Sequence, residues 1–330
     1  MAGGERVTMM RVLITGANGF VGRQLSIELA AAGWHVRAAV RRPFRPQSSA
    51  LPYEEHLVGA IGRDTDWSVA LSGVEAVVHL AGLSIVRDAR AGSVLAAFRD
   101  VNVEGTRILA RACLQNGVRR ILFLSSIRAV GERTEPGRPF SEGSPCRPAD
   151  PYGISKCEAE QALLKELRPG SVETVILRPP LIYGPGAGAN FLRLMRAVDR
   201  RIPLPLGRVR NTRSLVYIRN LTSGVIACLS HPLAAGEVFN VADAECLSTA
   251  GLMNSLGEAL GRRVILPPVP IWVLRAAGRL TGKAGDVGRL VDSLEMTIDK
   301  IRKRLGWAPP FATREGLEAA ASWYRAAVNP

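Results

Sequence analysis

Short apolar runs and longer amphipathic stretches alternate through the first half of the chain. The apolar runs predict strands at 11–15, 35–40, 56–58, 74–80, 120–125 and 172–177. The amphipathic stretches predict helices at 20–32, 93–116 and 152–167. Strands this apolar are typical of a sheet that helices cover on both faces. The alternation therefore predicts an α/β fold with a parallel, doubly wound sheet.

The pattern changes after Arg178, where proline and glycine cluster at 179–188 and 203–207. Helices are predicted at 190–200, 221–230 and 249–260, and short apolar segments lie at 214–218, 238–241 and 264–266. This mixture predicts a smaller, mixed α/β C-terminal lobe. We expect an N-terminal extension at 1–10, a first domain at 11–178, and a second lobe at 179–330 with some segments returning to the first domain.

The first predicted strand ends in a glycine-rich turn with the sequence TGANGFVG, at 15–22. A dinucleotide needs glycine at such a junction. Gly16 permits the tight turn, Gly19 lets backbone N–H groups approach a pyrophosphate, and Gly22 lets helix and strand pack closely. The helix that follows attracts phosphate charge at its N-terminus. The turn therefore predicts that 11–178 is a Rossmann dinucleotide-binding domain.

The second predicted strand ends in Arg41 and Arg42. An acidic residue at this position would bind the ribose hydroxyls of NAD, whereas two guanidinium groups suit the 2′-phosphate of NADP. The pair therefore favours NADP(H), with NAD(H) as the alternative.

Candidate catalytic residues follow the fifth predicted strand. Tyr152 and Lys156 are four residues apart on a predicted helix, so they share one face. A nearby ammonium favours the phenolate, which allows the phenol to exchange a proton near neutral pH. Ser126 ends the strand at the carboxyl edge of the sheet, where ligands bind, and can hydrogen-bond the reacting oxygen. These three residues predict hydride transfer coupled to proton transfer.

Two further polar residues lie in apolar surroundings. His79 precedes Ala81 and Gly82 at the end of the fourth predicted strand, and we expect it to be a hydrogen-bonded core residue. Asn102 interrupts an otherwise apolar helix, where it either positions backbone or water near the site or has a structural role.

Composition narrows the function classes. The 330 residues are 47% apolar, but no apolar run is long enough to cross a membrane, and no secretory signal is visible, so we expect a cytoplasmic protein. Five scattered cysteines and four histidines lack metal-ligand spacing, which predicts free thiols and no metal site. The net charge of +14 is dispersed and comes with few aromatic residues, so it suits phosphate-bearing small molecules better than nucleic acid.

Taken together, these motifs resemble the extended short-chain dehydrogenase/reductases, a group of nucleotide-sugar epimerases, dehydratases and reductases. The matching segments keep the family's order, at 15–22, 78–82, 102, 125–126, 152–156, 178–180 and 305–307. The segments at 123–127, 150–161, 189–194 and 213–216 are most similar to bacterial UDP-glucose 4-epimerase-like proteins. This group includes the 4-reductases that form UDP-N-acetylquinovosamine.

The resemblance implies site residues beyond those argued above. It implies cofactor contacts at Asn18, Phe20, Val21, Ile61, Leu80, Ala81, Gly82, Asn102 and Pro179, and contacts with the UDP group of the substrate at Asn190 and Arg213. An amide at a helix start and a guanidinium can both bind pyrophosphate oxygens. The family also implies a homodimer through the two long helices.

Two departures from the family pattern concern the ligands. The Gly-Asp pair that holds adenine is Gly59-Ala60 here, which leaves the backbone of Ile61 as the expected adenine contact. The Val-Tyr-Gly segment after the serine is Ala129-Val130-Gly131, which removes a phenol from the substrate pocket.

These observations lead to three hypotheses about the function. The first is a UDP-4-keto-6-deoxy-hexosamine reductase that exchanges its cofactor in each turnover, and the arginine pair favours it. The second is a UDP-sugar 4-epimerase with retained NAD. A dehydratase is disfavoured because Ile127 and Arg128, rather than an Asp-Glu pair, follow Ser126. The third is a non-catalytic dinucleotide sensor, which the presence of both Tyr152 and Lys156 disfavours.

Overall fold

The computed structural model describes residues 10–43, 52–85, 91–168 and 170–327. The chain divides into two compact units. Unit 1 comprises Met1–Ser125, Ile154–Leu177 and Val225–Val238, and unit 2 comprises Ser126–Gly153, Arg178–Gly224 and Phe239–Pro330. Helices α5 and α7 each contain residues of both units, so the chain crosses between them within regular elements.

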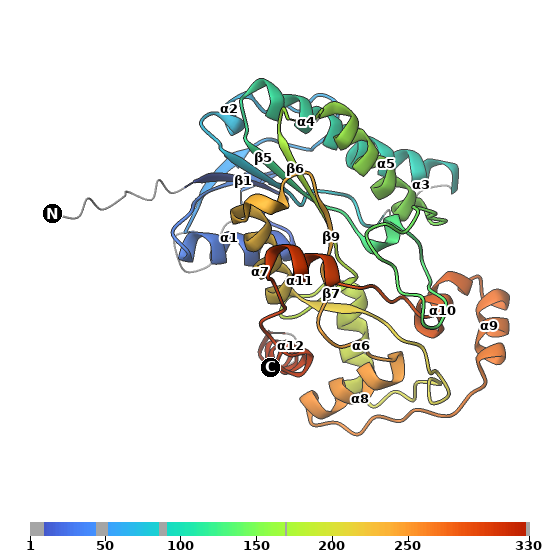
Figure 1. Cartoon of the computed structure of the whole chain (residues 1–330). Coiled ribbons are helices and arrows are strands. Elements are labelled where there is room, and N and C mark those ends of the chain that lie inside the picture. The colour runs from blue at the N-terminus through green and yellow to red at the C-terminus, as the bar shows by residue number, and fades with distance from the viewer. Residues whose placement is uncertain (1–9, 44–51, 86–90, 169, 328–330) are drawn as a thin grey trace. The chain divides into compact units, whose positions relative to one another are not determined.

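A seven-stranded sheet is the centre of unit 1, with the strand order β3-β2-β1-β4-β5-β6-β9 (Figure 1). The strands are β1 (Arg11–Thr15), β2 (His35–Val40), β3 (Glu54–Leu57), β4 (Ala76–His79), β5 (Arg120–Leu124), β6 (Glu173–Arg178) and β9 (Val238–Asn240). Neighbouring strands from β3 to β6 pair in parallel. The order reverses direction at β1, so the carboxyl ends of β1 and β4 form the switch point where such sheets bind ligands.

Helices cover the sheet because its strands are apolar on both faces. Helix α1 (Phe20–Ala31) lies on one face, and α2 (Ser68–Leu71), α4 (Gly105–Gln115) and α5 (Pro151–Glu166) lie on the other (Figure 1). The core of this second layer joins strand residues such as Leu13, Val77 and Phe123 to helix residues such as Leu109 and Leu163. The predicted doubly wound Rossmann sheet is confirmed.

The predicted helix at 93–116 is interrupted. Helix α3 (Ala91–Phe98) passes into a π-helical segment, η1 (Arg99–Glu104), before α4 begins. In this segment the hydroxyl of Thr106 donates to the carbonyl of Asn102 at 2.6 Å. Apolar periodicity did not reveal the insertion, because one widened turn changes the spacing of apolar positions by only one residue. π-Segments of this kind are frequent at functional sites.

Unit 2 contains a small two-stranded parallel sheet, β7 (Leu181–Tyr183) with β8 (Leu215–Tyr217), surrounded by helices. The helices and turns that complete the fold are η2 (Ile127–Ala129), α6 (Ala189–Asp199), α7 (Ile218–Ser230), η3 (Pro232–Ala234), α8 (Thr249–Leu260), α9 (Ile271–Leu280), α10 (Ala284–Val291), α11 (Asp299–Leu305) and α12 (Thr313–Ala327). The predicted mixed α/β lobe is confirmed. The apolar segment 264–266 forms no strand, although Leu204 donates a backbone hydrogen bond to Ile265.

Candidate active site

The glycine-rich turn of unit 1 is built by close backbone contacts. Gly16 has a φ of +69°. A Cβ atom on Gly16 would lie 2.8 Å from the backbone nitrogen of Ala81, and one on Gly22 would collide with the carbonyl oxygen of Gly16. The turn therefore joins the ends of β1 and β4 in a space that only glycine fits, as the motif predicts.

The start of α1 fits a dinucleotide phosphate. Its N-cap residue, Gly19, makes no side-chain capping bond, and its first turn contains no acidic residue. The first N–H groups of a helix need acceptors from outside it, and phosphate oxygens are suited to that role. Asn18 reaches from this turn to Arg42, whose carbonyl oxygen accepts its side-chain amide at 2.9 Å. The glycine turn and the predicted NADP-selecting arginines are thus held together.

Arg41 and Arg42 are both exposed at the end of β2. Neither forms an ion pair with any residue in the ranges that the structure describes. Ile61 packs against Gly105 of α4, where a Cβ atom would lie 2.8 Å from its Cγ2 atom. This packing fixes the position of the Ile61 backbone, as the expected contact with adenine requires.

His79 is a buried, fully bonded core residue, as expected. Its Nδ1 atom lies 2.7 Å from the hydroxyl of Thr15, and its Nε2 atom lies 3.0 Å from that of Thr106. The Thr15 hydroxyl also accepts the N–H of Ala81 at 3.1 Å. Burial, and secondarily the charge of Lys156, lowers the pKa of His79 to about 3, so the ring is neutral near pH 7.

Asn102 joins three segments of unit 1 from the π-helical turn. Its Oδ1 atom accepts the N–H of Leu83 at 2.7 Å, and its Nδ2 atom donates to the Leu83 carbonyl at 3.0 Å and to the Ser155 hydroxyl at 2.9 Å. A Cβ atom on Gly82 would lie 3.1 Å from this Oδ1 atom and 3.9 Å from Nζ of Lys156. Asn102 therefore fixes the loop after β4 beside the residue that precedes Lys156.

Lys156 is buried in unit 1. Its Nζ atom donates to the carbonyl of Leu124 at 2.7 Å and lies 4.1 Å from the ring centroid of Phe123. Burial lowers its pKa to about 7, and the carboxylate of Glu160 opposes that shift. The hydroxyl of Ser125 in turn donates to Glu160. Glu160 lies one helical turn beyond Lys156, a spacing that could have revealed it in the sequence.

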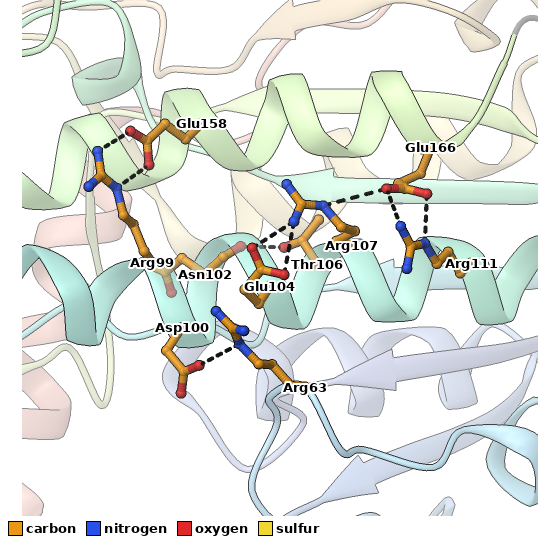
Figure 2. A network of polar contacts seen from close by, with 10 residues as sticks. All are labelled: Arg63, Arg99, Asp100, Asn102, Glu104, Thr106, Arg107, Arg111, Glu158 and Glu166. Atoms are coloured by element: carbon orange, nitrogen blue, oxygen red, sulfur yellow. Dashed lines mark hydrogen bonds and ion pairs between the residues drawn. The ribbon is translucent and has the colours of Figure 1, made fainter.

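Charged side chains also join α4 and η1 to α5 (Figure 2). Arg99 pairs with Glu158 at 2.6 Å, and Arg111 pairs with Glu166 at 2.8 Å. Arg107 pairs with Glu104 at 2.7 Å and with Glu166 at 3.4 Å. These contacts fix the helix that carries Lys156 against the helix that carries Asn102.

Ser126 and Tyr152 meet within unit 2. Burial is the largest effect on the pKa of Tyr152 and raises it above its ordinary value, whereas the charge of Arg128 and then a hydrogen bond from the Ser126 side chain act to lower it. Ser126 also caps the turn η2 by accepting the N–H of Arg128 at 3.2 Å. The carbonyl oxygen of Pro179 accepts the N–H of Ile127 at 2.9 Å, which places this predicted cofactor contact beside the same turn.

The N-terminus of α5 is organised by Asp150. Its Oδ1 atom accepts the N–H groups of Tyr152 and Gly153 at 3.0 and 3.2 Å. Its Oδ2 atom forms an ion pair with Arg128 at 2.6 Å. Asp150 and Arg128 were not predicted as site residues, because their contact joins segments that are far apart in the chain.

The predicted substrate residues Arg213 and Asn190 also belong to unit 2. Arg213 is partly buried and donates to the carbonyl of Asp292 at 2.9 Å. Its pKa is lowered first by burial and also by the charges of Arg128 and Arg289, so Arg213 lies within electrostatic reach of Arg128. Asn190 is exposed in the first turn of α6, which has no side-chain cap. No contact links Asn190 to the other site residues in the described part of the chain.

Comparison with known proteins identifies the family of the chain. A sequence model of the NAD dependent epimerase/dehydratase family matches residues 12–242. The chain belongs to this family. It is 39% identical to a UDP-glucose 4-epimerase of Vibrio cholerae over 331 residues, covering 100% of both chains. The prediction of an extended short-chain dehydrogenase/reductase enzyme is confirmed.

Solved structures show the same fold. A short-chain dehydrogenase/reductase superfamily protein from Agrobacterium tumefaciens with bound NAD has a TM-score of 0.75 and 26% identity, covering 96% of this chain and 97% of that one. MoeE5 in complex with UDP-glucuronic acid and NAD has a TM-score of 0.76 and 26% identity, covering 96% and 100%. Among the described residues, no helix is long and apolar enough to cross a membrane, and no cluster of three candidate metal ligands occurs.

Proposed function

We propose that this chain transfers hydride at C4 of a UDP-sugar, as a UDP-4-keto-6-deoxy-hexosamine reductase in the synthesis of surface polysaccharide precursors. The observation that carries the proposal is the hydrogen bond between Ser126 and Tyr152, and Arg213 lies in the same unit within electrostatic reach of Arg128. Two hydroxyls suit a reacting carbonyl oxygen, and a guanidinium suits the diphosphate of the substrate. The UDP-sugar names of the V. cholerae relative and the MoeE5 complex support this substrate class.

Tyr152 would move the proton at the C4 oxygen, and Ser126 would hold that oxygen by a hydrogen bond. In the reductive direction the phenol donates its proton and becomes a phenolate. Lys156, one helical turn away on α5, would favour that phenolate and bind the nicotinamide ribose. The dinucleotide supplies the hydride when it is bound.

The residues of unit 1 fit this cofactor. The uncapped start of α1 would hold the pyrophosphate, and Ile61 would face the adenine. The proposed preference is for NADP(H), because Arg41 and Arg42 extend into solvent beside the glycine turn without ion pairs in the described ranges. Two guanidinium groups can bind a 2′-phosphate through charge-assisted hydrogen bonds.

A UDP-sugar 4-epimerase is the second candidate. The name of the V. cholerae relative favours it, as do the solved relatives that contain NAD. The same residues would serve both reactions, since an epimerase removes hydride from C4 and returns it to the opposite face. The two candidates differ in whether the cofactor leaves the enzyme after each turnover.

One matrix of assays separates them. Purified protein would be mixed with NADPH or NADH and UDP-4-keto-6-deoxy-N-acetylglucosamine, and separately with UDP-glucose or UDP-N-acetylglucosamine. The reductase proposal predicts loss of absorbance at 340 nm in step with product formation. Epimerised product without cofactor oxidation would support the second candidate and overturn the first.

The cofactor assignment has its own test. The double variant Arg41→Ala/Arg42→Ala should lose most of its preference for NADPH over NADH, with little change in the KM for NADH. Arg63→Ala is the matched control, because Arg63 is also an exposed arginine of unit 1, with a side chain 70% exposed. A wild-type preference for NADH above tenfold would remove the role proposed for the arginine pair.

The proposed assembly is a homodimer through α4 and α5. Each helix exposes a large apolar side chain, Leu114 on α4 and Leu164 on α5, at 46% and 50%. Both lie on helices that the ion pairs of Figure 2 hold together. Sedimentation should show a dimer for the wild type and a monomer for Leu164→Arg. A wild-type monomer at micromolar concentration would exclude this assembly.

A further inference from the structure

A guanidinium lies against the ring of the candidate catalytic tyrosine. The Cζ atom of Arg128 is 5.4 Å from the ring centroid of Tyr152. Arg128 follows Ser126 by two residues, in the turn η2 that Ser126 caps. The position of Arg128 beside the phenol requires an explanation from the contacts around it.

The arginine is held in place by a second set of contacts. Asp150 pairs with Arg128 at 2.6 Å, and the two side chains are 20% and 28% exposed. The backbone before Asp150 is fixed in turn, because Glu132 accepts the N–H groups of Ala149 and Asp150 at 2.8 and 3.0 Å. A Cβ atom on Gly153 would collide with the carbonyl oxygen of Arg128, so glycine there allows α5 to approach the turn.

The charges that face Tyr152 come from several elements. Arg128 contributes a cation from η2, and Asp150 contributes an anion from the loop before α5. Ser126 adds a hydrogen bond. The effect of Arg128 in lowering the pKa of Tyr152 is larger than the effect of Asp150 in raising it. Arg213 adds a further positive charge within reach of Arg128.

We propose that Arg128 is a positioning residue of the reaction, which acts through Tyr152: Asp150 holds its guanidinium against the ring, where it stabilises the phenolate. The proposal rests on the proposed role of Tyr152 as proton donor. In that step the O–H bond of Tyr152 breaks and an O–H bond forms at the C4 oxygen, while C4 receives hydride from the reduced nicotinamide. The electron pair of the broken bond stays on the tyrosine oxygen, and Arg128 compensates that charge.

An optical titration tests this without any substrate. Phenolate absorbance near 295 nm would be followed with pH in the wild type and in Tyr152→Phe, so that the difference reports Tyr152 alone. Arg128→Gln, paired with its own Tyr152→Phe version, should raise the midpoint of this difference by about one pH unit or more. Arg128→Lys, which keeps the charge, should shift it by less than half as much.

Controls distinguish this inference from the proposed function. Arg138→Gln is the matched control, since Arg138 is an arginine of unit 2 whose side chain is 81% exposed, and it should leave the midpoint unchanged. Thermal melts would verify that each variant is folded. If Arg128→Gln does not fold, Arg128→Lys still tests the inference. Unchanged midpoints in both Arg128 variants would overturn the inference. If the midpoint moves but Tyr152→Phe retains full turnover, the role of Tyr152 in the proposed function fails and the electrostatic contact stands.

Discussion

Tyr152 and Lys156 lie one turn apart on α5, yet their surroundings differ. Tyr152 belongs to unit 2, is partly buried and has the charged pair Arg128–Asp150 against it. Lys156 belongs to unit 1 and is buried between the ring of Phe123 and a backbone carbonyl, with one carboxylate in reach. Burial is therefore the largest effect on the pKa of both groups, but two opposite charges act on the phenol, whereas one carboxylate acts on the ammonium.

The contrast shows how one helix can combine two groups with separately controlled proton affinities. Helical spacing places the pair on one face, but it does not set either pKa. Burial and Arg128 act on Tyr152 in opposite directions, and burial and Glu160 act on Lys156 in opposite directions. Burial thus shifts the pKa of each group, and one charged neighbour shifts it back in part.

The largest effect is expected from removing the phenolic hydroxyl. Tyr152→Phe should lower kcat by about 10²- to 10⁴-fold, the usual contribution of a positioned acid–base group, with little change in cofactor affinity. Tyr324→Phe is the control, because the hydroxyl of Tyr324 on α12 donates to Asp199 at the C-terminal end of α6 at 3.2 Å and has no proposed role in the chemistry. Steady-state kinetics with the substrate identified by the assay matrix provides the measurement. Activity within threefold of the wild type would remove Tyr152 from the chemistry.

The buried ammonium should make stability depend on pH. The pKa of Lys156 is about 7 in the folded protein, compared with 10.5 as its ordinary value. Between these values the unfolded chain binds more protons, so the free energy of unfolding should rise with pH by up to about 1.4 kcal/mol per unit from this group. In Lys156→Met this contribution should be absent from denaturation curves recorded between pH 7 and 10.

Lys165→Met controls for the loss of a lysine from α5, because Lys165 is exposed on the same helix. Its pH dependence of stability should match the wild type. If Lys156→Met shows the same rise as the wild type, the ammonium is hydrated in the folded protein, and the contrast with Tyr152 disappears.

The sequence predicted the regular parts of the fold well. The strands β1 and β2 and the helix α8 have the predicted bounds, because strong apolar patterns and glycine boundaries define them. The π-helical segment at 99–104 and the helices after residue 270 were not predicted. The former changes the spacing of apolar positions by only one residue. Of the latter, helix α12 has 15 residues with an amphipathic pattern and could have been predicted.

The site residues were predictable where one short motif fixes their positions relative to one another. The glycine turn and the Tyr152–Lys156 spacing are local, so their placement followed from the sequence. The contacts of Arg128 with Asp150 and of Ser125 with Glu160 join segments that only the fold brings together. Side-chain identity alone could not show that these charges face the candidate catalytic pair.

An intermediate effect is expected for Asn102, whose hydrogen bonds support the side of α5 that carries Lys156. Asn102→Ala removes the hydrogen bonds of Asn102 to Leu83 and Ser155 in a buried region, so it should cost about 1–3 kcal/mol of unfolding free energy. Asn116→Ala is the control, because this exposed amide bonds only the carbonyl of Ala112 in the described residues and should cost less. Urea titration measures both. Equal costs would show that the bonds around Asn102 are replaced by water.

The smallest effect is expected for the charges on the solvent side of the same helices (Figure 2). Arg107 and Glu104 pair at 2.7 Å, but their side chains are 33% and 22% exposed. Water and salt screen such pairs, so a double-mutant cycle with Arg107→Ala and Glu104→Ala should give a coupling energy below about 1 kcal/mol that falls as salt rises. Because Arg107 also pairs with Glu166, every variant of the cycle would carry Glu166→Ala, so that the coupling energy reports the Arg107–Glu104 pair alone. A coupling above about 2 kcal/mol that is insensitive to salt would mean that this surface is buried in solution. The Arg107–Glu104 pair would then no longer serve as an example of charges that water screens, in contrast to the surroundings of Tyr152 and Lys156.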